Sequence, residues 1–194
     1  MLDVALAHAE IAPLATRLAT RVPREADVGP SVRRAAVAAV LRVTETPELL
    51  LIKRAEHALD PWSGHMAFPG GRHEEGDASL METAMRETLE EVGLDLAAGR
   101  LLGQLDDLAP VTPSLPPLLI RPFVALVPPD VMVQPSDEVA ATFWVPLAQL
   151  RAPESQIQYA HQINGVVSHY PAYAVGPHAV WGLTHRMLRQ LLSL

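Results

Sequence analysis

Cysteine is absent from the 194 residues of this chain. Disulfide bonds and thiol chemistry are therefore excluded, and the composition fits the reducing cytoplasm. No apolar run reaches the roughly 18 residues that a membrane-spanning helix needs. The first twenty residues contain Asp3 and Glu10 and lack a basic start, so they do not resemble a signal peptide. We expect a cytoplasmic protein without a membrane segment.

An excess of positive charge is also missing, because the formal net charge is -7 at pH 7. A protein that binds nucleic acid through a basic face is therefore disfavoured. An anionic small molecule is still an acceptable substrate if divalent metal ions bridge it to a negatively charged site.

Repeats and low-complexity tracts are lacking too. A composition of 49% hydrophobic and 19% charged residues is normal for a globular protein with a sizeable core. The length fits one domain. We expect a single domain over residues 1–194, with an N-terminal extension over 1–30 and the core domain over 31–194.

Hydrophobic patterning predicts a mixture of strands and helices. The apolar runs 35–43 and 48–54 flank a short turn and predict a β-hairpin. Further strands are expected at 99–108, 118–127 and 138–147, and helices at 78–92 and 181–192. Residues 1–20 would form a helix with Val4, Ile11, Leu14 and Leu18 inward, interrupted at Pro13. These elements indicate an α+β fold, with a mixed sheet packed against helices.

Three glutamates, Glu87, Glu90 and Glu91, crowd together near the end of the predicted helix 78–92. Like charges at this spacing repel each other. Either the helix is a solvated surface element with ion pairs four residues apart, or a divalent cation neutralises the cluster. Asp77, or Ser79 with Glu82, can cap the start of the helix.

Helical periodicity predicts opposite faces for the apolar and acidic residues of this helix. At about 100° per residue, we expect one buried stripe of Ala78, Met81, Met85, Leu89 and Val92. The glutamates would point outward on the other side. Arg86 is four residues from both Glu82 and Glu90 and can pair with both. Gly93 can end the helix.

The segment before the helix favours the metal interpretation. Residues 68–71, Phe-Pro-Gly-Gly, form a predicted tight turn whose glycines expose backbone groups. Such a loop facing a carboxylate-rich helix offers the oxygen ligands that Mg²⁺ prefers, with water and substrate phosphates as the remaining ligands. The ion would polarise a phosphoryl group and activate water. The eight histidines show no spacing typical of metal ligands.

The segment 71–94 resembles the signature of Nudix hydrolases, which cleave nucleoside diphosphates linked to another moiety. The second half of that signature matches at Arg86, Glu87, Glu90, Glu91, Gly93 and Leu94. Thr88 departs from an aliphatic position. Between Gly71 and Arg86 stand 14 residues where the pattern has 13, and Asp77 occupies the place of a glutamate. We therefore assign Asp77 no role beyond that of a helix cap.

The extra residue in this loop and the aspartate within it resemble features of the coenzyme A diphosphatase branch of that family. Leu50, Leu51, Arg54 and Gly64 also match this branch, whereas Ala55 replaces its serine and a second arginine is missing. Segments 138–147 and 180–184 resemble later parts of the branch. The resemblance therefore covers about residues 33–192.

The resemblance implies a mixed sheet between helices, with the signature in a loop–helix–loop. It implies hydrolysis of a pyrophosphate linkage, which for coenzyme A gives 4′-phosphopantetheine and 3′,5′-ADP. It also implies roles: Glu87 and Glu91 as the main ligands of Mg²⁺ or Mn²⁺, with Glu90 and the Gly71 carbonyl as further ligands. Arg86 would orient Glu87 or Glu90 through charge-assisted hydrogen bonds.

The general base and the substrate contacts are less defined. Glu138, just before a predicted strand, is a candidate base, and the alternative is a solvated strand edge, which is the usual environment of a single exposed glutamate. Lys53 and Arg54 can meet phosphate, or pair with Glu56 or Glu74. The other candidates for substrate contact are Arg33 and Arg34, for a 3′-phosphate, His65 and His73 in the flanking loops, and Phe68, Gly70 and Gly71 of the tight turn. Segments 109–117 and 154–176 are candidates for an apolar groove that holds the pantetheine arm.

Three functions stay open at this stage. They are a coenzyme A diphosphatase, a Nudix hydrolase for another substrate such as ADP-ribose or a nucleoside triphosphate, and a non-catalytic nucleotide-binding module. The complete set of Arg86, Glu87, Glu90 and Glu91 disfavours the last, because a binding module has little need of three clustered carboxylates. Either a monomer or a homodimer is compatible with the sequence.

Overall fold

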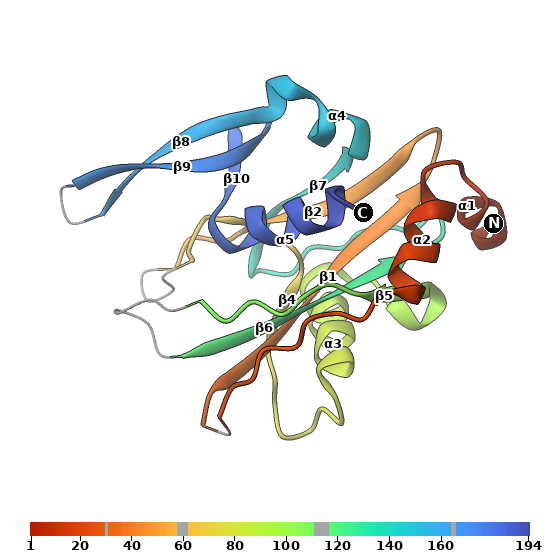
Figure 1. Cartoon of the computed structure of the whole chain (residues 1–194), viewed down its shortest axis with the longest axis horizontal. Helices are drawn as coiled ribbons and strands as arrows, with labels where there is room; N and C mark the ends of the chain where they lie inside the picture. The colour runs from red at the N-terminus through yellow and green to blue at the C-terminus, as the bar shows by residue number, and fades with distance from the viewer. Residues whose placement is uncertain (30, 58–61, 111–116, 164–165) are drawn as a thin grey trace.

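The structure, a computed structural model, describes residues 1–29, 31–57, 62–110, 117–163 and 166–194. A mixed sheet lies at its centre, with α3 (Leu80–Val92) on one side and α1 (Leu2–Leu6), α2 (Ile11–Thr20) and α5 (Gly182–Leu192) on the other (Figure 1). The predicted α+β fold is thereby confirmed. None of the described helices has both the length and the apolar composition that crossing a membrane requires.

The central sheet contains seven strands: β1 (Arg33–Val43), β2 (Pro47–Arg54), β3 (Met66–Ala67), β4 (Gly70–Arg72), β5 (Arg100–Gln104), β6 (Leu118–Leu126) and β7 (Val139–Pro146). Its main order is β3-β2-β1-β6-β5, with β4 paired to β1 and β7 to β2. Only β1 and β6 run parallel. The predicted hairpin is confirmed, with Leu41 opposite Leu49.

The hairpin strands diverge beyond that pair, and residues 66–72 insert between them. β6 occupies one edge of β1 and β7 one edge of β2, so β4 must pair with the remaining edge of β1 and β3 with that of β2. Gly71 lies opposite Ala36, and the Ala38 N–H donates to the Pro69 carbonyl at 2.9 Å. This insertion fixes the tight turn in the middle of the sheet.

Alternation along β1 builds two cores, because successive side chains of a strand point to opposite faces. Ala35, Ala39 and Leu41 join the core beneath α1, α2 and α5, and Ala36, Ala38 and Val40 join the core beneath α3. A strand that is buried on both faces is expected where helices cover both sides of a sheet.

A second, antiparallel sheet was not predicted. It contains β8 (Gln156–Ile163), β9 (Val166–Val175) and β10 (His178–Trp181), in the order β10-β9-β8. It follows β7, α4 (Leu147–Arg151) and the 3₁₀ turn η2 (Pro153–Ser155). In Figure 1 its β8–β9 hairpin, in blue shades, extends away from the central sheet.

The N-terminal prediction needs correction. Two short helices replace the single helix, and the break lies at residues 7–10 instead of Pro13. Pro13 lies in the first turn of α2, where a missing N–H leaves no helical hydrogen bond unmade. Ile11, Leu14 and Leu18 are buried as expected, but Val4 is exposed. Expected strand 99–108 is shortened to β5, which contains a bulge between Leu101 and Gly103, and a single bridge then joins Leu108 to Ile120.

The predicted buried face of α3 is also wrong. Met81 is 37% exposed and Leu89 50% exposed, whereas Ala84, Thr88 and Glu91 are buried. The helix is rotated by about one residue, or roughly 100°, from the expected orientation. Small side chains at Ala84 and Thr88 allow close packing on the alanine-rich β1, and this contact outweighs burial of the larger methionines.

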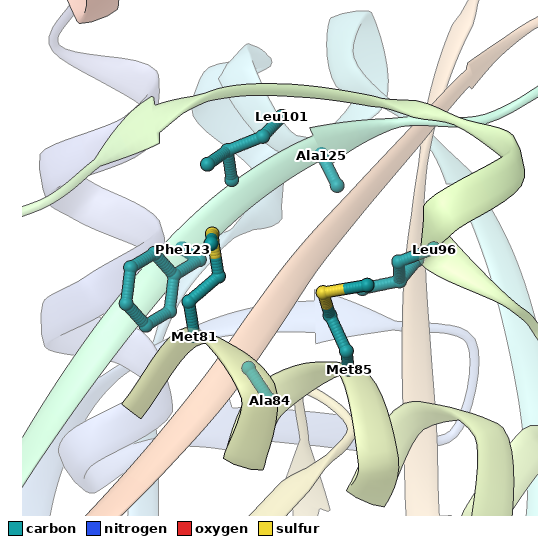
Figure 2. A pocket seen from close by; sticks show the side chains of 7 residues that line it. All are labelled: Met81, Ala84, Met85, Leu96, Leu101, Phe123 and Ala125. Atoms are coloured by element: carbon teal, nitrogen blue, oxygen red, sulfur yellow. The ribbon is translucent and has the colours of Figure 1, made fainter. Parts of the chain in front are cut away.

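Methionine side chains of α3 pack instead at the edge of the sheet. Figure 2 shows Met81 and Met85 beside Phe123 and Ala125 of β6. Together with Ala84, Leu96 and Leu101 these residues line a small cavity of about 30 Å³. Every lining side chain is apolar, and no glutamate contributes. This cavity is a packing defect, and the chemistry of the helix must lie on another face.

Candidate active site

The inserted glycine turn contacts two of the three clustered glutamates. The Gly70 N–H donates to Oε2 of Glu91 at 2.8 Å. A Cβ on Gly71 would lie 2.4 Å from the carboxyl carbon of Glu87, so only glycine leaves room for that carboxylate. Gly70 has φ +148°, and a Cβ there would meet the Ala36 carbonyl at 2.3 Å. Both glycines are therefore required by the approach of the turn to β1 and α3.

Glu91 is a buried carboxylate, only 3% exposed, at the end of α3. Burial raises its pKa to about 7, and the Gly70 hydrogen bond and the positive charge of Arg54 oppose this shift. An Arg54 guanidinium nitrogen lies 3.5 Å from Oε1 of Glu91. Arg54, at the end of β2, thus approaches the cluster, where the sequence left phosphate contact and pairing with Glu56 or Glu74 as alternatives.

Glu87 stands on the same side of the helix, one turn earlier. Burial raises its pKa, hydrogen bonding to Arg86 opposes the shift, and the negative charges of Glu90 and Glu138 add to it. Glu90 has a 58% exposed side chain. The cluster therefore grades from a buried Glu91 to a solvated Glu90, which corrects the expectation that all three point outward.

Arg86 ties this cluster to the preceding loop. Its Nη1 donates to Glu87 and to Glu90, each at 3.0 Å, as the predicted orienting role requires. Its Nε and Nη2 donate to Asp77 at 2.9 and 3.0 Å. These bonds hold the pKa of Asp77 well below its usual range and raise the pKa of Arg86.

The structure corrects two expectations about this loop. Of the two predicted caps of α3, Asp77 is wrong and Ser79 is confirmed, because Ser79 is the N-cap and accepts from the Glu82 N–H at 3.2 Å. Glu82 does not pair with Arg86, since its carboxylate accepts from the Ala78 N–H. We did not predict from the sequence that Asp77 binds Arg86. The aspartate in the lengthened loop, nine residues before the arginine, could have indicated this pair.

Glu138 immediately precedes β7 and approaches the cluster through the strand next to Arg54. Its carbonyl accepts from the Ala55 N–H at 2.8 Å, next to Arg54, and its side chain is exposed. The charge of Glu138 contributes to the raised pKa of both Glu87 and Glu91. The structure thus brings the candidate base to the glutamates from a distant part of the sequence.

The remaining candidates occupy varied environments. Phe68 is 2% exposed and packs inside the core. Arg33 and Arg34 are exposed and form the first two positions of β1, instead of preceding the strand. Lys53 is half-buried on β2, opposite Met66. His73 bonds Thr83 Oγ1 at 2.8 Å, which places it within the loop structure.

His65 and the groove segments extend beyond the glutamates. The His65 carbonyl accepts from the Arg54 N–H at 3.0 Å, and its ring lies against Trp181. Residues 111–116 of the expected pantetheine groove lie outside the described residues. Segment 154–176 contains both β8 and β9.

The donors suit a hard divalent cation. Two carboxylates whose charged forms are disfavoured by burial and by each other would be stabilised by a positive ion, and oxygen ligands are those that Mg²⁺ and Mn²⁺ prefer. Across the described ranges, no three acidic or histidine side chains already converge on one point. Arg86 instead holds one oxygen each of Glu87 and Glu90. The chemistry of the donor set therefore fits the ion.

Comparison with known proteins agrees with this geometry. Residues 32–164, more than half of the chain, match the NUDIX domain. An uncharacterized Nudix hydrolase, NudL, of Enterobacter sp. (strain 638) is 36% identical over 165 residues, covering 82% of this chain and 81% of the relative. An uncharacterized protein of Schizosaccharomyces pombe, C14C4.10c, is 44% identical over 121 residues, which cover 59% of this chain and 36% of that longer protein.

A solved structure shares the fold. The MutT/nudix family protein from Enterococcus faecalis superimposes with a TM-score of 0.56 at 16% identity, covering 96% of this chain and 69% of that one. The signature residues, the sheet that places them and the sequence matches lead to one assignment. The chain belongs to the Nudix hydrolase family and is a pyrophosphohydrolase.

Proposed function

We propose that this enzyme hydrolyses the pyrophosphate linkage of coenzyme A or its derivatives, releasing 4′-phosphopantetheine and 3′,5′-ADP. The observation that carries the proposal is the Asp77–Arg86 contact. The signature loop is one residue longer than the general pattern, and its aspartate has a defined structural task in anchoring the arginine. That loop length and that aspartate are the features by which the sequence resembles the coenzyme A diphosphatase branch.

In this proposal Glu87 and Glu91 hold Mg²⁺ or Mn²⁺, with Glu90 and the Gly71 carbonyl as further ligands. A bound divalent ion supplies polarisation of a phosphoryl oxygen and activation of water. The chain supplies positioning. Gly70 fixes one oxygen of Glu91, and Arg86, held by Asp77, fixes Glu87 and Glu90.

Two further groups would act on the substrate. Arg54 adds positive charge beside Glu91, where phosphate oxygens would enter, and guanidinium groups suit such contacts. Glu138 would remove the proton of the attacking water as the general base, because its side chain is exposed and its charge acts on both Glu87 and Glu91. Lys53, Arg33 and Arg34 are further candidates for phosphate contact.

A substrate panel tests this function. Purified protein is incubated with Mg²⁺ or Mn²⁺ and coenzyme A, ADP-ribose, dinucleoside polyphosphates or nucleoside triphosphates, and products are separated by chromatography. We expect coenzyme A to give the highest kcat/KM and two products, 4′-phosphopantetheine and 3′,5′-ADP. Much faster turnover of ADP-ribose than of coenzyme A would show that ADP-ribose is the preferred substrate and would contradict the proposal.

Glu91→Gln provides the control for contaminating hydrolases, because it keeps the shape of a buried side chain and removes its charge. We expect this variant to lose turnover of every compound in the panel. Turnover by the variant equal to that of the wild type would show that the measured activity does not arise at this site.

A further inference from the structure

Aromatic and imidazole rings gather on one face of the second sheet. Tyr159 and His161 of β8, Tyr170 of β9 and His65 each lie against Trp181 at the end of β10. The ring centroids are 5.4, 4.5, 5.2 and 4.8 Å from that of Trp181, respectively. All five side chains are half-buried. In a chain with only 5% aromatic residues, this concentration is unusual.

The strand register explains why the rings share a face. Tyr159 lies opposite Tyr170, and Ala172 lies opposite both Ile157 and Trp181. Because residues two apart on a strand point the same way, these side chains stand on one side of the sheet. The other side carries Tyr173, Val175 and Val180, which are buried in the main core.

This ring face adjoins the candidate active site. The His65 backbone is paired to Arg54, whose guanidinium reaches Glu91, and the His65 ring lies 4.8 Å from Trp181. Figure 1 shows β10 running from the second sheet toward α5, and β10 contacts β3, the strand that follows His65. A substrate whose phosphates lie at Glu91 therefore has the rings within reach of its neighbouring groups.

We propose that Trp181, Tyr159 and Tyr170 form a stacking platform for the planar base in the nucleotide half of the substrate. The core does not need these rings, because it closes on the opposite side of the sheet. Their faces suit a purine, since base–aromatic stacking tolerates different bases and stabilises binding without hydrogen-bond readout. The placement of the phosphates rests on the proposed function.

Binding of product-like ligands tests the platform without catalysis. Trp181 becomes the single tryptophan when Trp62→Phe and Trp144→Phe are combined. We expect 3′,5′-ADP and AMP to quench its fluorescence saturably with Mg²⁺ present, and ribose 5-phosphate and 4′-phosphopantetheine not to do so. Equal quenching by 4′-phosphopantetheine would overturn the base platform in favour of a site for the pantetheine arm.

Kinetics give a second readout in the otherwise wild-type protein. We expect Tyr159→Ala to raise KM for the nucleotide substrate roughly 5- to 100-fold, with kcat within about twofold, and Tyr159→Phe to restore KM. His169→Ala is the matched control, because this exposed residue precedes Tyr170 and points to the opposite face. We expect it to leave KM unchanged.

The two proposals can fail separately. If ADP-ribose is the better substrate and Tyr159→Ala raises the KM for ADP-ribose, the stacking platform is supported and coenzyme A is rejected as the preferred substrate. If coenzyme A is hydrolysed with the same KM by Tyr159→Ala as by the wild type, the platform is overturned and the proposed function stands.

Discussion

Asp77 and Arg86 form a two-point hydrogen-bonded pair between the signature loop and helix α3, with donor–acceptor distances of 2.9 and 3.0 Å. The carboxylate of Asp77 is only 6% exposed. The remaining terminal nitrogen of Arg86 serves Glu87 and Glu90. One guanidinium group thus links the loop by hydrogen bonds to two of the proposed metal ligands.

Asp77→Asn should weaken this pair and leave Arg86 poorly compensated. Both residues of this pair are half-buried, and losing hydrogen bonds to a charged group typically costs about 1.5–3 kcal/mol. We expect the free energy of unfolding to fall by about this amount in urea titrations. We also expect kcat to fall at least tenfold, because Glu87 and Glu90 lose their common donor. Glu75→Gln, an exposed residue of the same loop, should change neither quantity.

Gly71→Ala should separate activity from folding. The three atoms nearest to its Cβ would all belong to the Glu87 carboxylate, the end of a side chain that can move aside. We expect turnover to fall more than a hundredfold while Tm changes by only a few degrees. Gly76→Ala, in open space, is the matched control and should behave as wild type. A fully active Gly71→Ala would show that the position of Glu87 does not matter for hydrolysis.

The stability of the metal-free protein should depend on pH through Glu91. Its folded-state pKa of about 7 lies above its ordinary value of 4.5, so the folded state binds the proton more tightly. This tighter proton binding adds up to about 3 kcal/mol to the free energy of unfolding. The contribution is fully present below pH 4.5 and is lost as the pH rises through 7. Urea titrations in EDTA should show this decline in the wild type.

Glu91→Gln cannot ionise at this position and should lack that part of the pH dependence. At pH 8, added Mn²⁺ should stabilise the wild type and have little effect on the variant. Parallel pH profiles for the two proteins in EDTA would contradict the buried, proton-binding state of Glu91.

Glu138→Gln tests the assignment of the general base. Loss of a general base typically reduces kcat by 10²- to 10⁴-fold, and we expect a loss in this range with KM for the substrate little changed. Because Glu138 is exposed, Tm should stay close to that of the wild type. Near-full turnover by Glu138→Gln, with Glu91→Gln inactive, would leave Glu138 as a solvated strand residue.

Local sequence patterns predicted those parts of the fold that depend on neighbouring residues. Two apolar runs around a proline-containing turn gave the β1–β2 hairpin, and Gly93, with φ +69°, ends α3 as expected. The orientation of α3 could not be predicted in this way. Its buried face is chosen by close packing on the alanines of β1 and by the contact of Glu91 with Gly70, and both are tertiary effects.

The second sheet was missed although a signal existed. Residues 156–163 alternate polar and apolar or aromatic side chains, as at Ile157, Tyr159 and His161. The segment 154–176 was expected instead to line an apolar groove for the pantetheine arm. Glu138 and Arg54 were candidates from the sequence, but local patterns do not predict the pairing of β7 with β2 that brings them to the glutamates.

Crystals grown with excess Mn²⁺, measured by anomalous scattering, test the proposed metal site most directly. We expect an anomalous peak at bonding distance from oxygens of Glu87 and Glu91, and we expect hydrolysis to stop when EDTA is added. An empty map at these glutamates, together with unchanged hydrolysis in EDTA, would contradict the proposed site and the chemistry assigned to it.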